Sequence, residues 1–446
     1  MTKFFFKRPT RIIIFLFFIS ATSVLKGQIL SEKERAERYD VLLNERIHKV
    51  LPGLMDRHDM DMWLLISREY NEDPILRTML PATWLNARRR TIILFYRDAE
   101  NDVFDALAVA RYGIGQTIKS AWDKEKQPDQ WARLIELIQE RNPKKIGVNI
   151  SEHYGIADGL VHTDYQEFMS HLPLELQSRV ISAEPLAVSW VETRTENEMK
   201  EFEALVQLTH DIIAEAFSTR VITPGKTTSE EVVWWLRQKV TDLGLETWFH
   251  PTVDIQRNNE ALKSHIEAFS NGYQEMVIQP GDLLHCDFGV SYMGLNTDCQ
   301  QHAYVPVLDE TAVPEYLKKA FTTGNRVQDI FTGNFSLGRS GNEILRTSLE
   351  KGRAEGLRPS IYTHPLGSFG HSAGTTLGMW DAQQGVPGSG DHPMAYNTAY
   401  AIELNNTVFI PEWGKDVRIM LEEAGYFDQD GFRYVNGRQE EILLVR

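Results

Sequence analysis

Short apolar runs alternate with amphipathic segments through the N-terminal third of the chain. Runs rich in β-branched and aromatic residues predict strands, and apolar residues every three or four positions predict helices. The predicted strands are 62–66, 91–96, 103–109 and 145–150, and the predicted helices are 34–50 and 129–140. Strands that alternate with helices indicate a small α/β domain, which we expect to end near Val191.

Capping boxes mark helix starts in the second half. In each, Ser or Thr is followed three residues later by Glu, a pairing that satisfies free backbone N–H groups at a helix N-terminus. The pairs are Thr195 with Glu198, Thr228 with Glu231, and Ser340 with Glu343. A further helix is predicted over 315–331, and strand-like runs cover 283–289, 399–409 and 417–427. The order helix, helix, strand pair occurs twice, which predicts an α+β region with two halves related by a pseudo-two-fold.

The chain opens with a basic segment and an apolar run. Basic residues between positions 3 and 11 precede the apolar residues 12–25, and polar residues 26–28 follow. This order is typical of a secretory signal peptide. An uncleaved anchor is the alternative, although the run is short for a membrane span of about 20 residues. We expect cleavage after Gly27 and export to the periplasm or the cell exterior.

The formal net charge of −15 bears on the partners of the protein. Sequence-independent binding to nucleic acid needs clustered Lys and Arg, which release counterions from the phosphates. The acidic balance therefore argues against a nucleic-acid partner.

Two aspartates lie on the arms of a predicted hairpin. If Asp287 and Asp298 pair across it, their side chains share a face and stand close together. Two such carboxylates repel each other unless a cation or a proton lies between them. The alternative is a pair of solvated residues beside a turn. Cys286 and Cys299, the only cysteines, would pair as well and face away from the aspartates, and we expect free thiols rather than a disulfide.

Three further residues have a context that favours metal binding. His371 is surrounded by Gly and Ser, which let the backbone approach a crowded centre. Glu403 and Glu422 lie within apolar, strand-like runs. Burying an uncompensated charge is costly, and a metal ion is the simplest compensation where several such groups converge.

The order Asp287, Asp298, His371, Glu403, Glu422 resembles the pita-bread metallopeptidases, peptidase family M24. This family includes methionine aminopeptidases, Xaa-Pro aminopeptidases and prolidases. The motif D-x-G-x-x-Y-x-G that starts at Asp287, the Gly-His at 370–371 and the Glu-Glu-Ala at 422–424 are similar to its motifs.

The resemblance also implies a domain order. It covers residues 192–446, while residues 28–191 are similar to the creatinase-type domain of the proline-specific branch. We therefore expect a signal peptide at 1–27, a creatinase-type α/β domain at 28–191 and a pita-bread α+β domain at 192–446.

The resemblance implies a site with two divalent metal ions. Asp298 and Glu422 would bridge both ions, Asp287 would bind one, and His371 with Glu403 would bind the other. Oxygen-rich donors with one His suit Mn, which we favour, and also Co, Zn or Fe. Two ions lower the pKa of a water between them, and a bridging hydroxide would be the nucleophile. Glu403 would also take the proton.

The resemblance also implies roles for histidines outside the metal ligands. His265 resembles the family histidine that stabilises the oxyanion, with His250 as the alternative. The family has a second His a few residues beyond its His ligand, whereas residues 375–381 contain no His. His364 lies upstream and is the candidate for that catalytic role. Two positions that hold Arg in the family are Gln301 and Met420 here.

The expected function is a dinuclear-metal exopeptidase that hydrolyses Xaa-Pro bonds, as an aminopeptidase or a dipeptidase. The alternatives are hydrolysis of another amide or ester, and a non-catalytic binding protein on the same fold. The expected partners are a small peptide substrate and a second copy of the chain. We expect no stable membrane insertion once the signal is cleaved.

The leader pattern predicts a mature N-terminus near Gln28. N-terminal sequencing of the protein from its native host checks this. An intact Met1 on a cytosolic protein would contradict it.

Overall fold

The computed structural model of the chain describes residues 29–269 and 275–446. The predicted signal peptide at 1–27 therefore lies outside the described residues. Within the described ranges, each helix is too short or too polar to cross a bilayer.

The first unit is built on a six-stranded sheet with the order β4-β3-β2-β1-β5-β6. Strand β1 pairs antiparallel with β2 and parallel with β5. Its strands are β1 Met62–Arg68, β2 Arg90–Asp98, β3 Val103–Val109, β4 Lys119–Ser120, β5 Ile146–Val148 and β6 Val180–Ser182. Its helices are α2 Glu32–Glu45, α3 Leu51–Arg57, α4 Pro74–Arg77, α5 Gln130–Arg141, α6 His162–His171, α7 Leu174–Gln177 and α8 Glu184–Glu192, with a π-helix at Arg46–Val50 and a 3-10 helix at Gly155–Ala157.

Both faces of this sheet are buried, which explains the continuous apolar runs. Side chains alternate along a strand, so Trp63 and Leu65 pack into one core while Met62, Leu64 and Ile66 pack into another. The predicted strands and helices of this region are present. The helix predicted at 34–50 is longer than expected, because it continues through the π-helix into α3.

The second unit has a nine-stranded sheet with the main path β12-β14-β15-β11-β8-β7. Strands β13, β16 and β17 pair with β14, β15 and β11 respectively. The strands of this unit are β7 Thr252–Gln256, β8 Leu283–Phe288, β9 Ser291–Tyr292, β10 Leu295–Asn296, β11 Cys299–Tyr304, β12 Pro359–Ile361, β13 His364–Leu366, β14 Thr398–Ile410, β15 Lys415–Asp428, β16 Gly431–Tyr434 and β17 Leu443–Leu444. Its helices are α9 Glu196–Ala216, α10 Ser229–Asp242, α11 His265–Phe269, α12 Glu315–Thr332 and α13 Gly341–Ala354.

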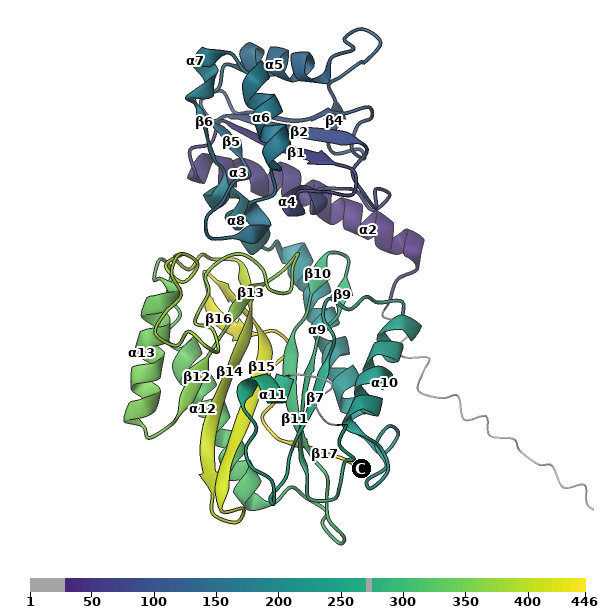
Figure 1. The fold of residues 1–446 in the computed structure, drawn as a ribbon, viewed down its shortest axis with the longest axis vertical. Helices are drawn as coiled ribbons and strands as arrows, with labels where there is room; N and C mark the ends of the chain where they lie inside the picture. Colours follow the sequence, from purple (N-terminus) through teal and green to yellow (C-terminus); the bar gives the residue numbers. More distant parts are fainter. Residues whose placement is uncertain (1–28, 270–274) are drawn as a thin grey trace, which may run out of the picture.

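Two helix pairs cover the two halves of this sheet (Figure 1). Helix α9 packs against β8 and β11, and α10 packs against β7. Helix α12 packs against β14 and β15, and α13 packs against β12. The three predicted capping boxes start α9, α10 and α13. Each half thus places two helices against its own strands, as the twofold pattern in the sequence predicts.

The hairpin of β8 and β11 corrects one expectation. Asp287 lies opposite Gln300 and Cys286 lies opposite Gln301, so neither the aspartates nor the cysteines pair directly. Asp298 is two residues before Gln300, and residues two apart share a face of a strand. The aspartates are therefore diagonal neighbours on one face. Both cysteines are buried free thiols, as expected.

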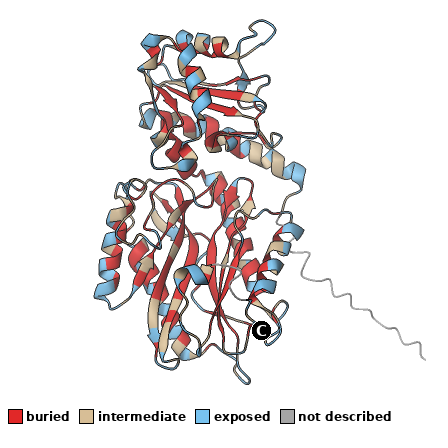
Figure 2. Ribbon diagram, viewed as in Figure 1, coloured by how far each residue is buried: buried red, intermediate tan, exposed pale blue. Residues whose placement is uncertain are grey.

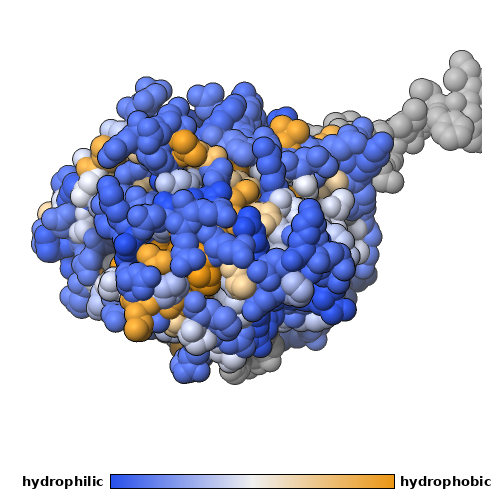
Figure 3. Space-filling model, turned by 90° about the horizontal axis from the view of Figure 1, so that it is seen from above, coloured by the Kyte–Doolittle hydropathy of each residue, from blue (hydrophilic) through white to orange (hydrophobic). Residues whose placement is uncertain are grey.

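The burial pattern places the centre of the second unit deep in the protein. Figure 2 shows buried residues along the strands of both sheets and exposed residues on the outer sides of the helices. Seen from above, the end formed by the first unit is mainly hydrophilic, with small separate apolar groups (Figure 3).

Candidate metal centre

A single row of side chains crosses the middle of the second sheet. Glu403 of β14 lies opposite Glu422 of β15, and Glu422 lies opposite Gln300 of β11. Gln300 in turn lies opposite Asp287 of β8. Because these residues are cross-strand neighbours, their side chains share one face of the sheet. The register alone therefore brings three carboxylates together from strands far apart in the sequence.

Asp298 completes a compact carboxylate cluster. Oxygen atoms of Asp287, Asp298 and Glu422 lie within 4.8 Å of one another. Asp298 is 4% exposed and Glu422 is 1% exposed. Water therefore cannot screen the repulsion between their charges.

His364 at the start of β13 faces this cluster. Its Nε2 atom lies 3.7 Å from Asp298 Oδ2 and 3.6 Å from Glu422 Oε1. Its Nδ1 atom lies 3.1 Å from the carbonyl oxygen of Pro365, which places the ring proton on Nδ1. The lone pair of Nε2 then points towards two carboxylates, an arrangement that is repulsive unless a cation or a proton lies between them. The separations of 3.6–3.7 Å are too long for a hydrogen bond from a protonated carboxyl, which favours a cation.

The buried atoms that face the cluster lack hydrogen-bond partners among the described residues. They are Asp287 Oδ1, Asp298 Oδ1, Glu422 Oε1 and His364 Nε2. Buried polar atoms normally have a partner, and a cation held between these four atoms would supply one. The donor set of carboxylates and one imidazole fits divalent transition-metal ions.

The same burial perturbs the acidity of these groups. Burial raises the pKa of Asp287 to about 7. Burial, followed by the charges of neighbouring carboxylates, raises the pKa of Asp298, Glu403 and Glu422 well above the usual range. Burial lowers the pKa of His364 to about 4, so its ring is neutral at pH 7. A neutral imidazole binds a metal as it is, whereas the carboxyl groups bind in their deprotonated form, so metal binding would release the protons that they hold.

Gln300 and Tyr362 are site residues that the sequence reasoning missed. Gln300 Nε2 donates to Glu403 Oε1 at 2.5 Å and to Glu422 Oε2 at 3.0 Å. The spacing of two residues between Asp298 and Gln300 on a strand is a signal that places them on one face. The buried Tyr362 hydroxyl lies near Glu403, whose charge contributes, after burial, to a raised Tyr362 pKa.

His371 lies at the exposed edge of the centre. Its ring meets that of His364 edge-on at 4.6 Å and that of Trp248 at 5.1 Å. One ring nitrogen of His371 lies within 4.8 Å of a ligand atom of Asp298 and of His364. A ring nitrogen of His364 also lies within 4.8 Å of carboxylate oxygens of Glu403 and Glu422. His364 is thus surrounded by more of the carboxylates than His371.

The two candidate oxyanion histidines occupy different surroundings. His265 stacks on Trp380 at 4.9 Å and meets Tyr362 edge-on at 5.2 Å, which places it beside the centre. Burial lowers its pKa to about 4. His250 is exposed against α10, where its ring lies 5.3 Å from that of Trp234. The geometry therefore favours His265 of the two.

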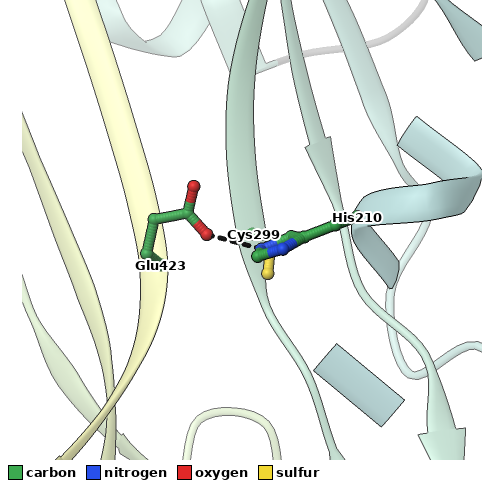
Figure 4. Close-up of side chains that lie close together, drawn as sticks. All are labelled: His210, Cys299 and Glu423. Carbon is green, nitrogen blue, oxygen red and sulfur yellow. Dashed lines mark hydrogen bonds and ion pairs between the residues drawn. The ribbon is translucent and has the colours of Figure 1, made fainter. Parts of the chain in front are cut away.

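Glu423 belongs to a different environment on the other face of β15 (Figure 4). Its Oε2 atom lies 2.7 Å from His210 Nε2. Its Oε1 atom accepts hydrogen bonds from Gln301 Nε2 at 3.2 Å and from the Gln439 backbone at 2.8 Å. Both oxygens of Glu423 thus have partners, whereas Glu422 Oε1 has none among the described residues. Because Gln301 is uncharged, His210 is the basic side chain that faces this carboxylate.

The comparison with protein families identifies the family of the chain. The sequence pattern of metallopeptidase family M24 matches residues 200–422, and the chain therefore belongs to this family. The protein is thus a metallopeptidase, and divalent metal ions are its cofactors. No curated protein matches the chain by sequence.

Solved structures with the same fold confirm the predicted fold class. The X-Pro aminopeptidase from Thermotoga maritima MSB8 is 16% identical with a TM-score of 0.61, over 87% of this chain and 99% of that one. The Xaa-Pro dipeptidase from Bacillus anthracis is 18% identical with a TM-score of 0.54, over 93% and 100%. Zn-substituted E. coli aminopeptidase P in complex with product is 12% identical with a TM-score of 0.57, over 92% and 97%.

The two faces of β15 predict different effects for two adjacent substitutions. Glu422→Gln should lose bound metal and nearly all activity, because it removes a charge that faces the cluster. Glu423→Gln is the matched control and should keep most of its metal, because its partners lie on the other face. Metal analysis of both purified variants measures this, and equal loss in the two would contradict the assignment.

The raised carboxyl pKa values predict how pH affects the metal-free protein. These groups have a pKa near 4 in the unfolded chain, so the folded state binds more protons above about pH 4. The free energy of unfolding should therefore fall as pH rises through the raised values. Thermal unfolding of chelator-treated protein should show a Tm lower by at least about 5 °C at about pH 8 than at about pH 5.5.

Two controls accompany this measurement. Added Mn²⁺ should remove most of the decrease, because the cation stabilises the ionised carboxylates. Asp298→Asn should reduce it in the metal-free protein. An equal pH dependence in the wild type and in Asp298→Asn would show that the cluster is not its source.

Proposed function

We propose that this metallopeptidase is an exopeptidase that hydrolyses Xaa-Pro bonds with two divalent ions. The observation that carries the proposal is the row of buried carboxylates with unpartnered oxygens beside the neutral His364. The neighbours named as X-Pro aminopeptidase and Xaa-Pro dipeptidase share the fold over nearly their full length, which supports the proline specificity. The N-terminal α/β unit, whose sequence resembles the creatinase-type domain of the proline-specific branch, supports it further.

We propose that the metal ligands are Asp287, Asp298, His364, Glu403 and Glu422. His364 replaces His371 in the set expected from the sequence, because its Nε2 lone pair faces Asp298 and Glu422. The family's second His, which the sequence does not show beyond His371, is then His371 itself. Bound ions supply a water of lowered pKa as a nucleophile. Mn²⁺ is our first choice, because most of the donors are oxygen atoms.

Gln300 orients the Glu403 carboxylate for proton transfer. The hydrogen bond from Gln300 Nε2 occupies Glu403 Oε1 and fixes the orientation of the carboxylate. No described residue donates a hydrogen bond to Glu403 Oε2, so this atom is the one that takes the proton.

His371 and His265 are placed to bind the substrate carbonyl. Burial and then the neighbouring His364 lower the pKa of His371 to about 4, so its ring is neutral and can donate one N–H. No described residue forms a hydrogen bond with its ring nitrogens. His265 approaches from the side of Tyr362 and Trp380. We assign oxyanion stabilisation to these two neutral imidazoles.

A dedicated site for proline has a physical reason. Proline lacks a backbone N–H and has a fixed φ angle, so a pocket that binds an ordinary peptide bond does not fit it.

We also propose export of the enzyme, on the basis of the leader pattern, and a homodimeric state. Size-exclusion chromatography with light scattering tests the latter, and a monomer at micromolar concentration would refute it.

The ligand assignment predicts a difference between two histidine variants. His364→Ala should lose metal, because it removes a ligand from the buried cluster. His371→Ala should keep its metal but lose kcat by about 100-fold or more, the usual effect of removing an oxyanion donor. Metal analysis with steady-state kinetics distinguishes them. The opposite pattern, with metal lost only in His371→Ala, would restore His371 as the ligand.

The proposed specificity predicts the result of a peptide panel. Wild-type enzyme loaded with Mn, Co or Zn should cleave Xaa-Pro dipeptides or tripeptides faster than the matched Xaa-Ala peptides, and chelator should abolish the activity. Cleavage of Xaa-Ala alone would refute the proline specificity. Hydrolysis of no peptide by metal-loaded enzyme would refute the exopeptidase proposal.

A further inference from the structure

The loop that carries His371 is packed into the N-terminal unit. This His371 loop, residues 367–376, follows β13 at the end of the second unit that faces α8 (Figure 1). Ala373 belongs to the apolar core that otherwise consists of residues from the first unit, and Phe369 packs against the same core. The segment around a candidate catalytic histidine is thus anchored by a different unit from the one that supplies the carboxylates.

Tyr154 connects the first unit to the backbone of this loop. Its hydroxyl donates a hydrogen bond of 3.0 Å to the carbonyl oxygen of Gly374. Tyr154 immediately precedes the 3-10 helix Gly155–Ala157. Burial and then the charge of Glu192 raise the Tyr154 pKa far above its usual range, so the hydroxyl keeps the proton that it donates.

The remaining sides of the loop leave little room for movement. Gly374 has φ of +144°, and a Cβ atom there would lie 2.7 Å from Pro365 Cγ. A Cβ atom on Gly370 would lie 2.3 Å from the Trp248 ring. Trp248 Nε1 is itself held by the carbonyl oxygen of Thr297 at 2.9 Å, beside Asp298. His371 therefore lies between a wall linked to the carboxylates and a contact with the first unit.

We propose that the N-terminal unit positions His371 for catalysis, with Tyr154 as the positioning residue. The inference rests on the proposed function in one respect, that His371 acts on the substrate. The Tyr154 hydroxyl binds the loop at the Gly374 carbonyl, three residues from His371, so its contribution reaches the reaction through the placement of the imidazole. The N-terminal unit then contributes to catalysis by positioning an active-site residue.

A double-mutant cycle tests this coupling in the full-length, Mn-loaded enzyme. Tyr154→Phe should lower kcat by about five-fold, the effect of one hydrogen bond, with metal content and KM within about two-fold of the wild type. In a His371→Ala background the same substitution should have no further effect on kcat. Tyr304→Phe is the matched control, because it removes a hydroxyl bonded to Glu310 at 2.8 Å and should leave kcat unchanged.

Other outcomes are decisive as well. Equal kcat in Tyr154→Phe and Tyr304→Phe, or a five-fold loss that persists in the His371→Ala background, would overturn the inference. Should the wild type cleave no peptide, the proposed function fails, and hydrogen exchange then tests the anchoring separately. Tyr154→Phe should accelerate exchange in residues 367–376 relative to Tyr304→Phe, and unchanged exchange there would overturn the anchoring itself.

Discussion

The structure of the second unit depends on carboxylates that are too deeply buried to ionise together. Asp287, Asp298, Glu403 and Glu422 share one face of a sheet, and several of their oxygens have no hydrogen-bond partner among the described residues. Such a cluster can be neutral, through protons, or charged, through cations. Both solutions stabilise the fold. His364 Nε2 lies 3.6–3.7 Å from the carboxylate oxygens, which is too long for a hydrogen bond from a protonated carboxyl, whereas a cation can lie between these atoms.

The sheet register is what creates this constraint. A shift of any of the strands by one residue would turn its carboxylate to the opposite face, where Glu423 is now bound by His210 and Gln301. The long pairing of β14 with β15 fixes Glu403 against Glu422, and Gln300 donates to both. The helices on the outer face bury the strands and hold this register. The fold therefore supplies the geometry, and the charges supply the affinity for metal.

Much of this arrangement was predictable from local patterns. The capping boxes located α9, α10 and α13, and carboxylates inside apolar runs identified Glu403 and Glu422. Local sequence patterns could not decide between His364 and His371 as the metal ligand. The decision depends on the pairing of β13 with β14, which puts His364 opposite Ala401, two residues from Glu403. The diagonal offset of Asp287 and Asp298 depends likewise on the two-strand turn of β9 and β10. A single sequence contains no signal for such registers.

The central claim is that two divalent cations occupy the carboxylate cluster. Anomalous diffraction from crystals of the Mn-loaded enzyme tests it most directly. We expect two peaks about 3.5–4 Å apart, the spacing of two-metal sites, between Asp287, Asp298, His364, Glu403 and Glu422. No peak within this cluster, or peaks bound only at the His210 side of β15, would contradict it.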